Sequence, residues 1–384
     1  MSGGRIVVAG GGPVGLAFAC ACDGLDVRVL EASEAPRAAR SGDYDLRVYA
    51  ISPGSRDLLQ AIGAWERLDP ARIAPVRRME VFGDAGGELA FSARATSALA
   101  WIVEAGRLAD AIEAVAAARA RIALARGAEA IAFGVDADTA WARLDGGERV
   151  EGDLLVGADG PDSRVRSAFG FRFRETPYGE AAVVANFETE RSHGESARQW
   201  FRADGVLAWL PLPGNRISIV WSTPTAHAGE LVALDARALE RRVREAGAAV
   251  LGDLKLISSV ARFPLRSIRV ASPVMRGVAL IGDAAHTIHP LAGQGVNLGF
   301  QDARVLAEVL AARSALERAG DWSVVRRYAR ARAEEVTAMQ LMTHGLDRLF
   351  SAPAEPIRRL RNAGMRLVDA QPWLKSILGR RAMR

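Results

Sequence analysis

The chain has 384 residues, of which 49% are hydrophobic and 25% charged, a composition typical of a globular protein with two domains. The formal net charge of +5 would suit a nucleic acid, an anionic membrane surface or an acidic ligand. No run of Lys and Arg is interleaved with aromatic residues, so we expect no nucleic-acid partner. No apolar run reaches transmembrane length and no signal peptide is visible, so we expect a cytoplasmic protein, soluble or peripheral at the inner face of a membrane.

A glycine-rich motif follows the first expected strand. Residues 5–9 form a short apolar run that predicts a buried parallel strand. The sequence then reads Gly10-Gly11-Gly12-Pro13-Val14-Gly15, which is a G-x-G-x-x-G motif. A helix is expected over 16–22. A second strand is expected over 27–30, ending at Glu31.

This order of strand, glycines, helix, strand and acid predicts a dinucleotide site. Gly10 allows the tight turn, Gly12 lets a pyrophosphate come close, and Gly15 lets the helix pack on the strand. Glu31 lies about 20 residues beyond the glycines, which is where an acid binds the adenosine ribose.

Two roles stay open for Arg47, which follows a polar loop and precedes an apolar segment. It could face the diphosphate or the ring edge of the cofactor, or it could be an ordinary solvated arginine, which the sequence alone favours. Downstream, a helix is expected over 53–68 and a hairpin over 76–91.

The next segment returns to alternating strands and helices. An apolar run over 101–104 leads to a helix over 108–118, whose start carries Arg107. Strands are expected over 121–125 and 141–144.

A second acidic turn follows the expected strand over 153–156. Asp159 and Gly160 come directly after it and precede the start of a helix. Open α/β sheets bind ligands at the carboxyl ends of their strands, so Asp159 is a candidate site residue.

The middle third, residues 171–263, changes character. Strands over 181–187, 206–212 and 216–221 are separated by turns, which predicts a second, mostly antiparallel sheet. Four large aromatic residues gather here: Trp200, Phe201, Trp209 and Trp221. Core packing explains them as well as an apolar ligand pocket does, so none is assigned a functional role. Beyond residue 302 the chain is expected to be helical to its end.

A third motif follows the apolar strand expected over 278–281. Gly282 and Asp283 begin a loop that continues to a helix over 298–306. Small residues and the helix start suit an anionic cofactor, while Asp283 could accept hydrogen bonds from a sugar hydroxyl. The loop residues expected to form a wall against a flat ring, or to lie beside it, are Pro290, Gly293, Gln294, Gly295, Val296 and Asn297. His286 and His289 are too few for a metal site.

Together, the Gly10–Gly15 run with Glu31, the run 157–160 and the run 282–299 resemble the three flavin motifs of the class A flavoprotein aromatic hydroxylases. The run 289–299 is similar to the ubiquinone-biosynthesis hydroxylase branch, as are residues 46–52, 103–104 and 210–212. The resemblance implies a para-hydroxybenzoate-hydroxylase-like fold of the α/β class. A Rossmann-like FAD-binding domain would then carry an inserted, mostly antiparallel β-sheet substrate domain and a C-terminal helical segment. The implied boundaries are 1–75, 100–170 and 265–310 for the FAD domain, 76–99 and 171–264 for the substrate domain, and 311–384 for the C-terminal helices.

The resemblance also implies residue roles. The ADP half of FAD would lie on the first motif and Glu31, and Arg47 would lie along the diphosphate and flavin. Asp159 and Gly160 would serve FAD and nicotinamide recognition, Asp283 the ribityl chain, and Pro290 to Gly295 the isoalloxazine. The family usually has Asn-Arg directly after Val-Glu, whereas this chain has Ala105-Gly106 and then Arg107, which we retain as a candidate cofactor contact.

The implied chemistry belongs to the cofactor, so no protein side chain is assigned a catalytic role. FAD would be reduced by NAD(P)H and would react with O₂ to form a C4a-hydroperoxide, which hydroxylates a polyprenylated phenol or quinol of ubiquinone biosynthesis. Two alternatives stay open: a hydroxylase of a small soluble aromatic compound, and a flavin-binding scaffold protein without turnover. Association with other quinone-biosynthesis proteins would fit any of these.

The C-terminal part is basic and partly apolar. Residues 357–384 hold eight Lys or Arg residues and one acid, Asp369. Such a tail could lie on an anionic membrane, or it could pack on the protein with a solvated basic face, and the sequence does not separate the two.

Overall fold

The structure, a computed structural model, describes residues 4–34, 44–93, 97–288, 295–351 and Asn362. Within these residues the first sheet has six strands, parallel except for the edge strand β19. In spatial order they are β19 (Val274–Met275), β20 (Val278–Leu280), β12 (Leu154–Gly157), β1 (Arg5–Ala9), β2 (Asp26–Glu31) and β8 (Ile122–Arg126). The strands are short and apolar because both faces of the sheet are covered.

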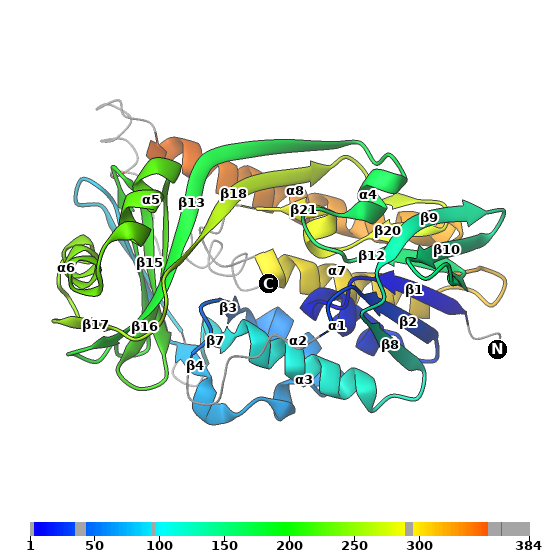
Figure 1. The fold of residues 1–384 in the computed structure, drawn as a ribbon, viewed down its shortest axis with the longest axis horizontal. Coiled ribbons are helices and arrows are strands. Elements are labelled where there is room, and N and C mark those ends of the chain that lie inside the picture. The colour runs from blue at the N-terminus through cyan, green and yellow to red at the C-terminus, as the bar shows by residue number, and fades with distance from the viewer. Residues whose placement is uncertain (1–3, 35–43, 94–96, 289–294, 352–361, 363–384) are drawn as a thin grey trace.

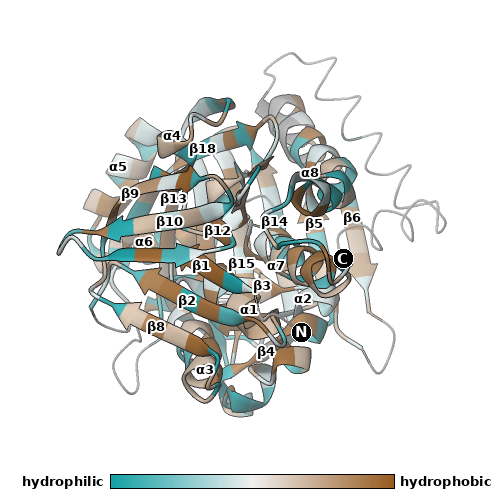
Figure 2. Cartoon of the chain, turned by 90° about the vertical axis from the view of Figure 1, so that its right-hand side faces the viewer, coloured by the Kyte–Doolittle hydropathy of each residue, from teal (hydrophilic) through white to brown (hydrophobic). Residues whose placement is uncertain are grey.

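Helices cover one face of this sheet and a small meander covers the other (Figure 1). The helices are α1 (Pro13–Ala21), α2 (Pro53–Ile62), α3 (Ala105–Ala117), α7 (Gly295–Ala311) and α8 (Trp322–Ser351). The meander comprises β9 (Ala130–Asp136), β10 (Thr139–Leu144) and β11 (Arg149–Gly152), beside the short helix α4 (Arg164–Ala168). Figure 2 shows both polar and apolar residues on α8, whose first turns pack Val324, Val325 and Tyr328 into the core.

A second sheet stands beside the first domain, and the long strands β13 and β18 run from one to the other (Figure 1). Its pairings among the described strands are antiparallel except for β14 with β5. Along the sheet lie β21 (His286–Thr287), β18 (Ala261–Val270), β13 (Phe173–Thr189), β16 (Arg216–Pro224), β15 (Gly205–Leu212), β14 (Ser196–Arg202), β5 (Arg78–Phe82) and β6 (Glu88–Ser92), with β17 (Leu254–Leu256) also paired to β13.

The two faces of the second sheet have different neighbours. Side chains alternate between the faces, so odd-numbered residues of β13, β15 and β16 point to one side. This outer face packs Phe187, Trp209 and Trp221 against α5 (Thr225–Ala233) and α6 (Ala236–Ala246). The even-numbered residues form the inner face. Part of that face packs on a third sheet of β3 (Val48–Ile51), β7 (Ala100–Glu104) and β4 (Ala74–Val76).

Most expected elements are confirmed, and the aromatic residues of the middle third are mainly core. The helix expected over 53–68 is wrong in length. It ends at Ile62, because Gly63 takes a left-handed conformation, and a separate 3₁₀ turn follows over Trp65–Arg67. Short 3₁₀ turns also occupy Pro70–Arg72 and Gly282–Ala284.

Two helix boundaries also differ from expectation. The helix expected from 108 begins at Ala105, and residues 312–321 interrupt the helices after α7. None of the helices in the described ranges combines the length and the apolar character of a membrane span.

Candidate functional site

The three motifs meet at the carboxyl ends of the parallel strands. Gly10 follows β1, Glu31 ends β2, Asp159 follows β12, and Gly282 with Asp283 follows β20. The strand registers align these ends, since Ala9 pairs with both Leu30 and Gly157. Positions as far apart in the sequence as Gly10 and Asp283 therefore share one edge of the sheet, which is where α/β sheets bind ligands.

The glycines of the first motif differ in what surrounds them. A Cβ at Gly10 would lie 2.3 Å from the Ala158 carbonyl oxygen, and one at Gly15 would lie 2.1 Å from the Gly10 carbonyl oxygen. Among the described residues, a Cβ at Gly12 would meet nothing within 4 Å. Gly10 and Gly15 are therefore required by packing, whereas Gly12 leaves open space at the first turn of α1, where helical N–H groups can receive a phosphate.

Glu31 closes the first motif. Its Oε2 accepts a hydrogen bond from the Gly11 N–H at 2.7 Å, and its Oε1 accepts one from the Ser33 N–H at 2.9 Å. These bonds hold the carboxylate beside the glycine loop and leave lone pairs free for a sugar hydroxyl.

The second motif is tied to the third by a buried arginine. Asp159 Oδ2 accepts the N–H groups of Arg164 and Val165 and so begins α4, while its Oδ1 is enclosed and has no partner in the described part of the chain. Gly160 follows with a positive φ of 84°. The Arg166 guanidinium donates to the carbonyl oxygens of Pro161 and Ala284, at 2.7 and 3.0 Å. The Asp159 turn and the Asp283 turn are thereby held together.

Small residues bring the third motif against the first. Gly282 has a positive φ of 60°, and a Cβ there would lie 3.2 Å from Val14. A Cβ at Gly299 would lie 2.7 Å from the same valine. Pro13 is the first residue of α1, next to Val14. A Cβ at Gly295, where α7 begins, would lie more than 4 Å from every other described residue except its chain neighbours and its own helix. Pro290, Gly293 and Gln294, together with His289, lie outside the described residues.

Asp302 is the centre of a buried charge network beneath the third motif. Its Oδ2 accepts the Gly282 N–H at 2.9 Å and lies 2.7 Å from His286 Nε2. Its Oδ1 accepts the Arg332 Nε–H at 2.7 Å. Arg332 also donates to the Leu298 carbonyl oxygen. Helix α8 therefore braces both the Asp283 turn and the start of α7.

The two aspartates of this region have opposite pKa shifts. Burial works to raise the pKa of Asp302, but His286 and Arg332 outweigh it, so the pKa is held below its usual range. Desolvation raises the pKa of Asp283 above its usual value, although His286 and Arg47 oppose the shift. The Asp283 side chain is nevertheless exposed. A carboxylate that is accessible and yet surrounded by protein lies on the wall of a concave site.

Arg47 and Arg107 lie in different surroundings. Arg47 is exposed, lies 5.3 Å from the ring centre of Phe263 on β18, and acts electrostatically on Asp283. Arg107 Nε donates to Glu104 Oε2 at 3.0 Å, and Glu104 also binds Arg72. Arg47 therefore lies near the third motif, while Arg107 belongs to a cluster at the start of α3.

Val296 and Asn297 connect α7 to the rest of the site. Val296 packs on the core. The Asn297 amide donates to the Ala50 carbonyl oxygen at 2.8 Å and accepts the Ser52 N–H at 2.9 Å. The third motif is thereby fixed to β3.

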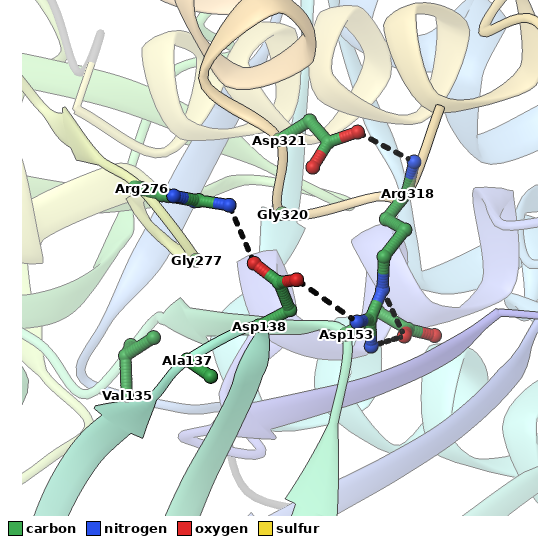
Figure 3. Close-up of a pocket in the computed structure, with 9 residues that line it drawn as sticks. All are labelled: Val135, Ala137, Asp138, Asp153, Arg276, Gly277, Arg318, Gly320 and Asp321. Atoms are coloured by element: carbon green, nitrogen blue, oxygen red, sulfur yellow. Dashed lines mark hydrogen bonds and ion pairs between the residues drawn. The ribbon is translucent and has the colours of Figure 1, made fainter. Parts of the chain in front are cut away.

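These residues fit an FAD molecule. Open space at Gly12 suits the pyrophosphate, Glu31 suits the ribose, and Asp283 is an accessible acceptor for the ribityl hydroxyls. By contrast, the hollow in Figure 3 lies at the opposite, amino edge of the sheet, beside Asp153 and Gly277. It offers room for about one water molecule and is closed by ion pairs of Asp138 with Arg276 and Arg318.

Sequence reasoning missed three residues that organise the site: Arg166, Asp302 and Arg332. A signal existed for Asp302, since it is a charged residue within the apolar helix expected over 298–306. A buried acid needs a partner, so a basic residue elsewhere was required. Nothing in the sequence showed that Arg332 supplies it.

Comparison with known proteins gives the family. The FAD binding domain family matches residues 5–342. The 3-demethoxyubiquinol 3-hydroxylase of Escherichia coli (strain K12) is 33% identical over 379 residues, covering 97% of this chain and 96% of that protein. The ubiquinone hydroxylase of Rhodospirillum rubrum is 34% identical, with 98% and 89% covered. The mitochondrial ubiquinone biosynthesis monooxygenase of Homo sapiens is also 34% identical, with 96% and 90% covered.

Solved structures agree on the fold. HpxO of Klebsiella pneumoniae, crystallised with FAD and uric acid, has a TM-score of 0.76 at 19% identity, covering 99% of this chain and 96% of that one. The p-nitrophenol 4-monooxygenase of Pseudomonas putida also has a TM-score of 0.76, at 18% identity, with 99% and 98% covered. The chain therefore belongs to the FAD-binding-domain family and is an FAD-dependent monooxygenase of the ubiquinone-biosynthesis hydroxylase group.

Proposed function

We propose that this protein hydroxylates the ring of a neutral, polyprenylated phenol or quinol, using NAD(P)H and O₂. The names of its relatives support a quinone precursor as substrate. The balanced reaction places one oxygen atom of O₂ in a ring C–H bond to give C–OH. The other oxygen leaves as water; NAD(P)H supplies the two electrons as hydride and becomes NAD(P)⁺, and one proton is taken up from solvent. FAD, when bound, supplies the redox chemistry, for which a C4a-hydroperoxide is the expected route.

The residues of this chain have binding and positioning roles in that reaction. The first motif and Glu31 would hold the ADP half of FAD, and Asp283 the ribityl chain. Arg47 and Arg107 are proposed contacts to the cofactor, and Asp159 with Gly160 would help to admit the nicotinamide. Pro290, Gly293, Gln294 and Gly295 are the proposed wall for the isoalloxazine, with Val296 and Asn297 next to it.

The observation that carries the substrate proposal is the neutral inner face of the second sheet. Small or apolar residues dominate its described positions on β13, β15 and β16: Ala182, Val184, Val206, Ala208, Leu210 and Val220. The charged pair of Glu188 and Arg216 lies at the strand ends, and its charges compensate each other at 3.2 Å. Such a wall suits an uncharged aromatic ring, and its cation on β16, Arg216, is already paired with Glu188.

The alternatives predict different behaviour. A small soluble aromatic acid would need a buried cation on the inner face, whereas Arg198 and Arg202 point to the outer side with Glu80 and Asp204. A scaffold protein would bind flavin but would not turn over any phenol.

Membrane contact remains a proposal for the basic tail. Residues 357–384 lie outside the described part of the chain except for Asn362. Peripheral contact with an anionic membrane, and with other quinone-biosynthesis proteins, would deliver a lipid-borne substrate.

The proposal is tested by product formation. The FAD-loaded protein is mixed with NADH or NADPH under isotopically labelled O₂, with a long-chain ortho-alkylphenol or with a soluble hydroxybenzoate. We expect one labelled oxygen in the alkylphenol product and none in the hydroxybenzoate. Efficient hydroxylation of the hydroxybenzoate alone would contradict the proposal, and NAD(P)H oxidation without either product would favour the scaffold alternative.

A further inference from the structure

Gln199 carries a buried amide that has no hydrogen-bond partner within the part of the chain that the structure describes. It lies on β14, retains 5% of its exposure, and points to the inner face together with Ala208, its cross-strand neighbour on β15. Among the described residues no hydrogen-bond partner is found for its side chain. Its Oε1 and Nε2 are not among the fully enclosed unpartnered atoms, so the amide keeps some exposure. A buried amide without a partner costs stability unless something else binds it.

The neighbours of Gln199 form an open apolar row across the sheet. Ala208 pairs with Val220 on β16, and Val220 pairs with Val184 on β13. None of these three residues belongs to a hydrophobic core cluster among the described residues, and Ala208 and Val220 are only partly buried. The row thus lies between packed regions and presents an apolar surface with one amide at its end.

This row is next to the third sheet, whose strand β3 contacts the cofactor site. One step along the strands, Ala197 and Leu210 pack with Ala50 of β3. The Ala50 carbonyl oxygen accepts the hydrogen bond of Asn297 in the third motif. Residues two apart on a strand are separated by about 7 Å, so the row begins one side-chain step from that sheet.

Two other polar atoms on the inner face also have no partner among the described residues, but they differ from the Gln199 amide. Asn186 Oδ1 and Ser218 Oγ are fully enclosed, and the two residues face each other across β13 and β16. The Asn186 amide nitrogen is engaged with the Asp45 carbonyl oxygen. These atoms are sealed inside the protein, whereas the Gln199 amide can still be reached.

We propose that Gln199 is a specificity-determining residue, which binds the ring oxygen of the substrate while the ring lies against Ala208 and Val220. An amide donates and accepts, as a phenol hydroxyl does, and it carries no charge to attract a carboxylate. This inference rests on the proposed function, because it places the substrate of that reaction on the inner face.

The experiment compares Gln199→Met with Gln60→Met. Both changes replace an amide by an unbranched apolar chain, and Gln60 is exposed on α2. Calorimetry on the FAD-loaded proteins gives the Kd of two probes, a long-chain ortho-alkylphenol and the alkylbenzene of the same length. We expect Gln199→Met to weaken phenol binding about tenfold and to leave alkylbenzene binding unchanged, since one hydrogen bond is lost. Gln60→Met should bind both probes as the parent protein does.

The outcomes separate the inference from the proposed function. If the parent protein binds and hydroxylates the phenol and Gln199→Met keeps the same preference for phenol over alkylbenzene, the role of Gln199 is wrong and the function stands. If the parent protein binds neither probe, the proposed function fails first. Should Gln199→Met lose FAD or melt early, Gln199→Ala is measured with the same probe pair. An equal loss for both probes would then contradict hydrogen bonding to the ring oxygen.

Discussion

The carboxyl edge of the parallel sheet and the inner face of the second sheet use opposite chemistry. The edge holds close glycines, accessible carboxylates and a buried network in which Asp302 binds Gly282, His286 and Arg332. The inner face holds mostly small apolar side chains and the single open amide of Gln199 among its described residues. The first suits a polar cofactor and the second an uncharged ring.

The difference explains how one protein can hold both kinds of molecule. The buried charge of Asp302 at the edge is compensated by His286 and by Arg332 on α8. An uncharged substrate would lose affinity for a face that carried unpaired charge, because such a charge prefers water. Breaking the charge network at the edge, or placing charge on the inner face, should therefore have separate effects.

The largest effect is expected from Asp302→Asn, which removes the carboxylate bound to the buried Nε–H of Arg332 and leaves that arginine its ion pair with Glu335. Loss of one partner of a buried pair costs about 3–5 kcal/mol of unfolding free energy. Denaturant unfolding measures it, with the exposed Asp23→Asn as control. Because the pKa of Asp302 is depressed in the folded protein, its contribution is present above about pH 4 and is lost as the pH falls through the folded pKa.

The acid dependence gives the sharper readout of that variant. The unfolding free energy of Asp302→Asn should fall less between neutral and low pH than that of the parent protein, because the variant has no Asp302 carboxylate to protonate. The double variant Asp302→Asn with Arg332→Met should cost less than the sum of the single changes. If the losses in unfolding free energy are additive, and if stability at low pH declines as in the parent protein, the two residues do not depend on each other.

A smaller effect, seen in cofactor binding, is expected from Asp283→Ala. If this carboxylate accepts the ribityl hydroxyls as proposed, its loss should weaken FAD binding about a hundredfold, so the purified protein should be largely apoprotein. The variant apoprotein should be no less stable than the parent apoprotein, since the raised pKa of Asp283 means that its ionisation opposes folding above that pKa. Absorbance of released flavin measures the first claim and thermal melting the second, with the exposed Asp57→Ala as control. Full flavin content would refute the ribityl role.

The glycines of the first motif separate folding from binding. Gly12→Ala adds a methyl group to open space, so apoprotein melting should be unchanged while FAD binding weakens about tenfold through contact with the pyrophosphate. Gly15→Ala places a methyl group against the Gly10 carbonyl oxygen and should lower the melting temperature itself. For both variants, flavin fluorescence titration measures the FAD affinity and thermal melting of the apoprotein measures the stability. Equal flavin affinity in Gly12→Ala and the parent would place the pyrophosphate elsewhere.

The smallest effect is expected from Arg107→Ala. Arg107 is about one-third exposed and is paired with Glu104, so its contribution to FAD binding should be roughly two- to fivefold. Flavin titration at low and high salt measures it, with Arg67→Ala on the 3₁₀ turn after α2 as control. If flavin affinity does not change at either salt concentration, Arg107 does not replace the arginine that the family carries one position earlier.

The sequence predicted the edge better than the inner face. Spacing along the chain was enough to predict Gly10, Gly15 and Glu31. Their motif is local in sequence, and these two glycines stand where the backbone leaves no room for a side chain. Arg332 could not be found, since its contact with Asp302 depends on how α8 packs on α7. Gln199 could not be found either. Its face is set by strand register, and its neighbours on β15 and β16 come from other parts of the chain.

The most informative single measurement is the rate at which bound FAD is bleached by NADH or NADPH, recorded with and without a long-chain ortho-alkylphenol. We predict a flavin spectrum that bleaches faster when the phenol is present and that recovers in air with formation of the hydroxylated product. A protein that cannot be reconstituted with FAD, or a bound flavin that never bleaches with either nucleotide, would contradict this assignment of edge and inner face to one hydroxylation reaction.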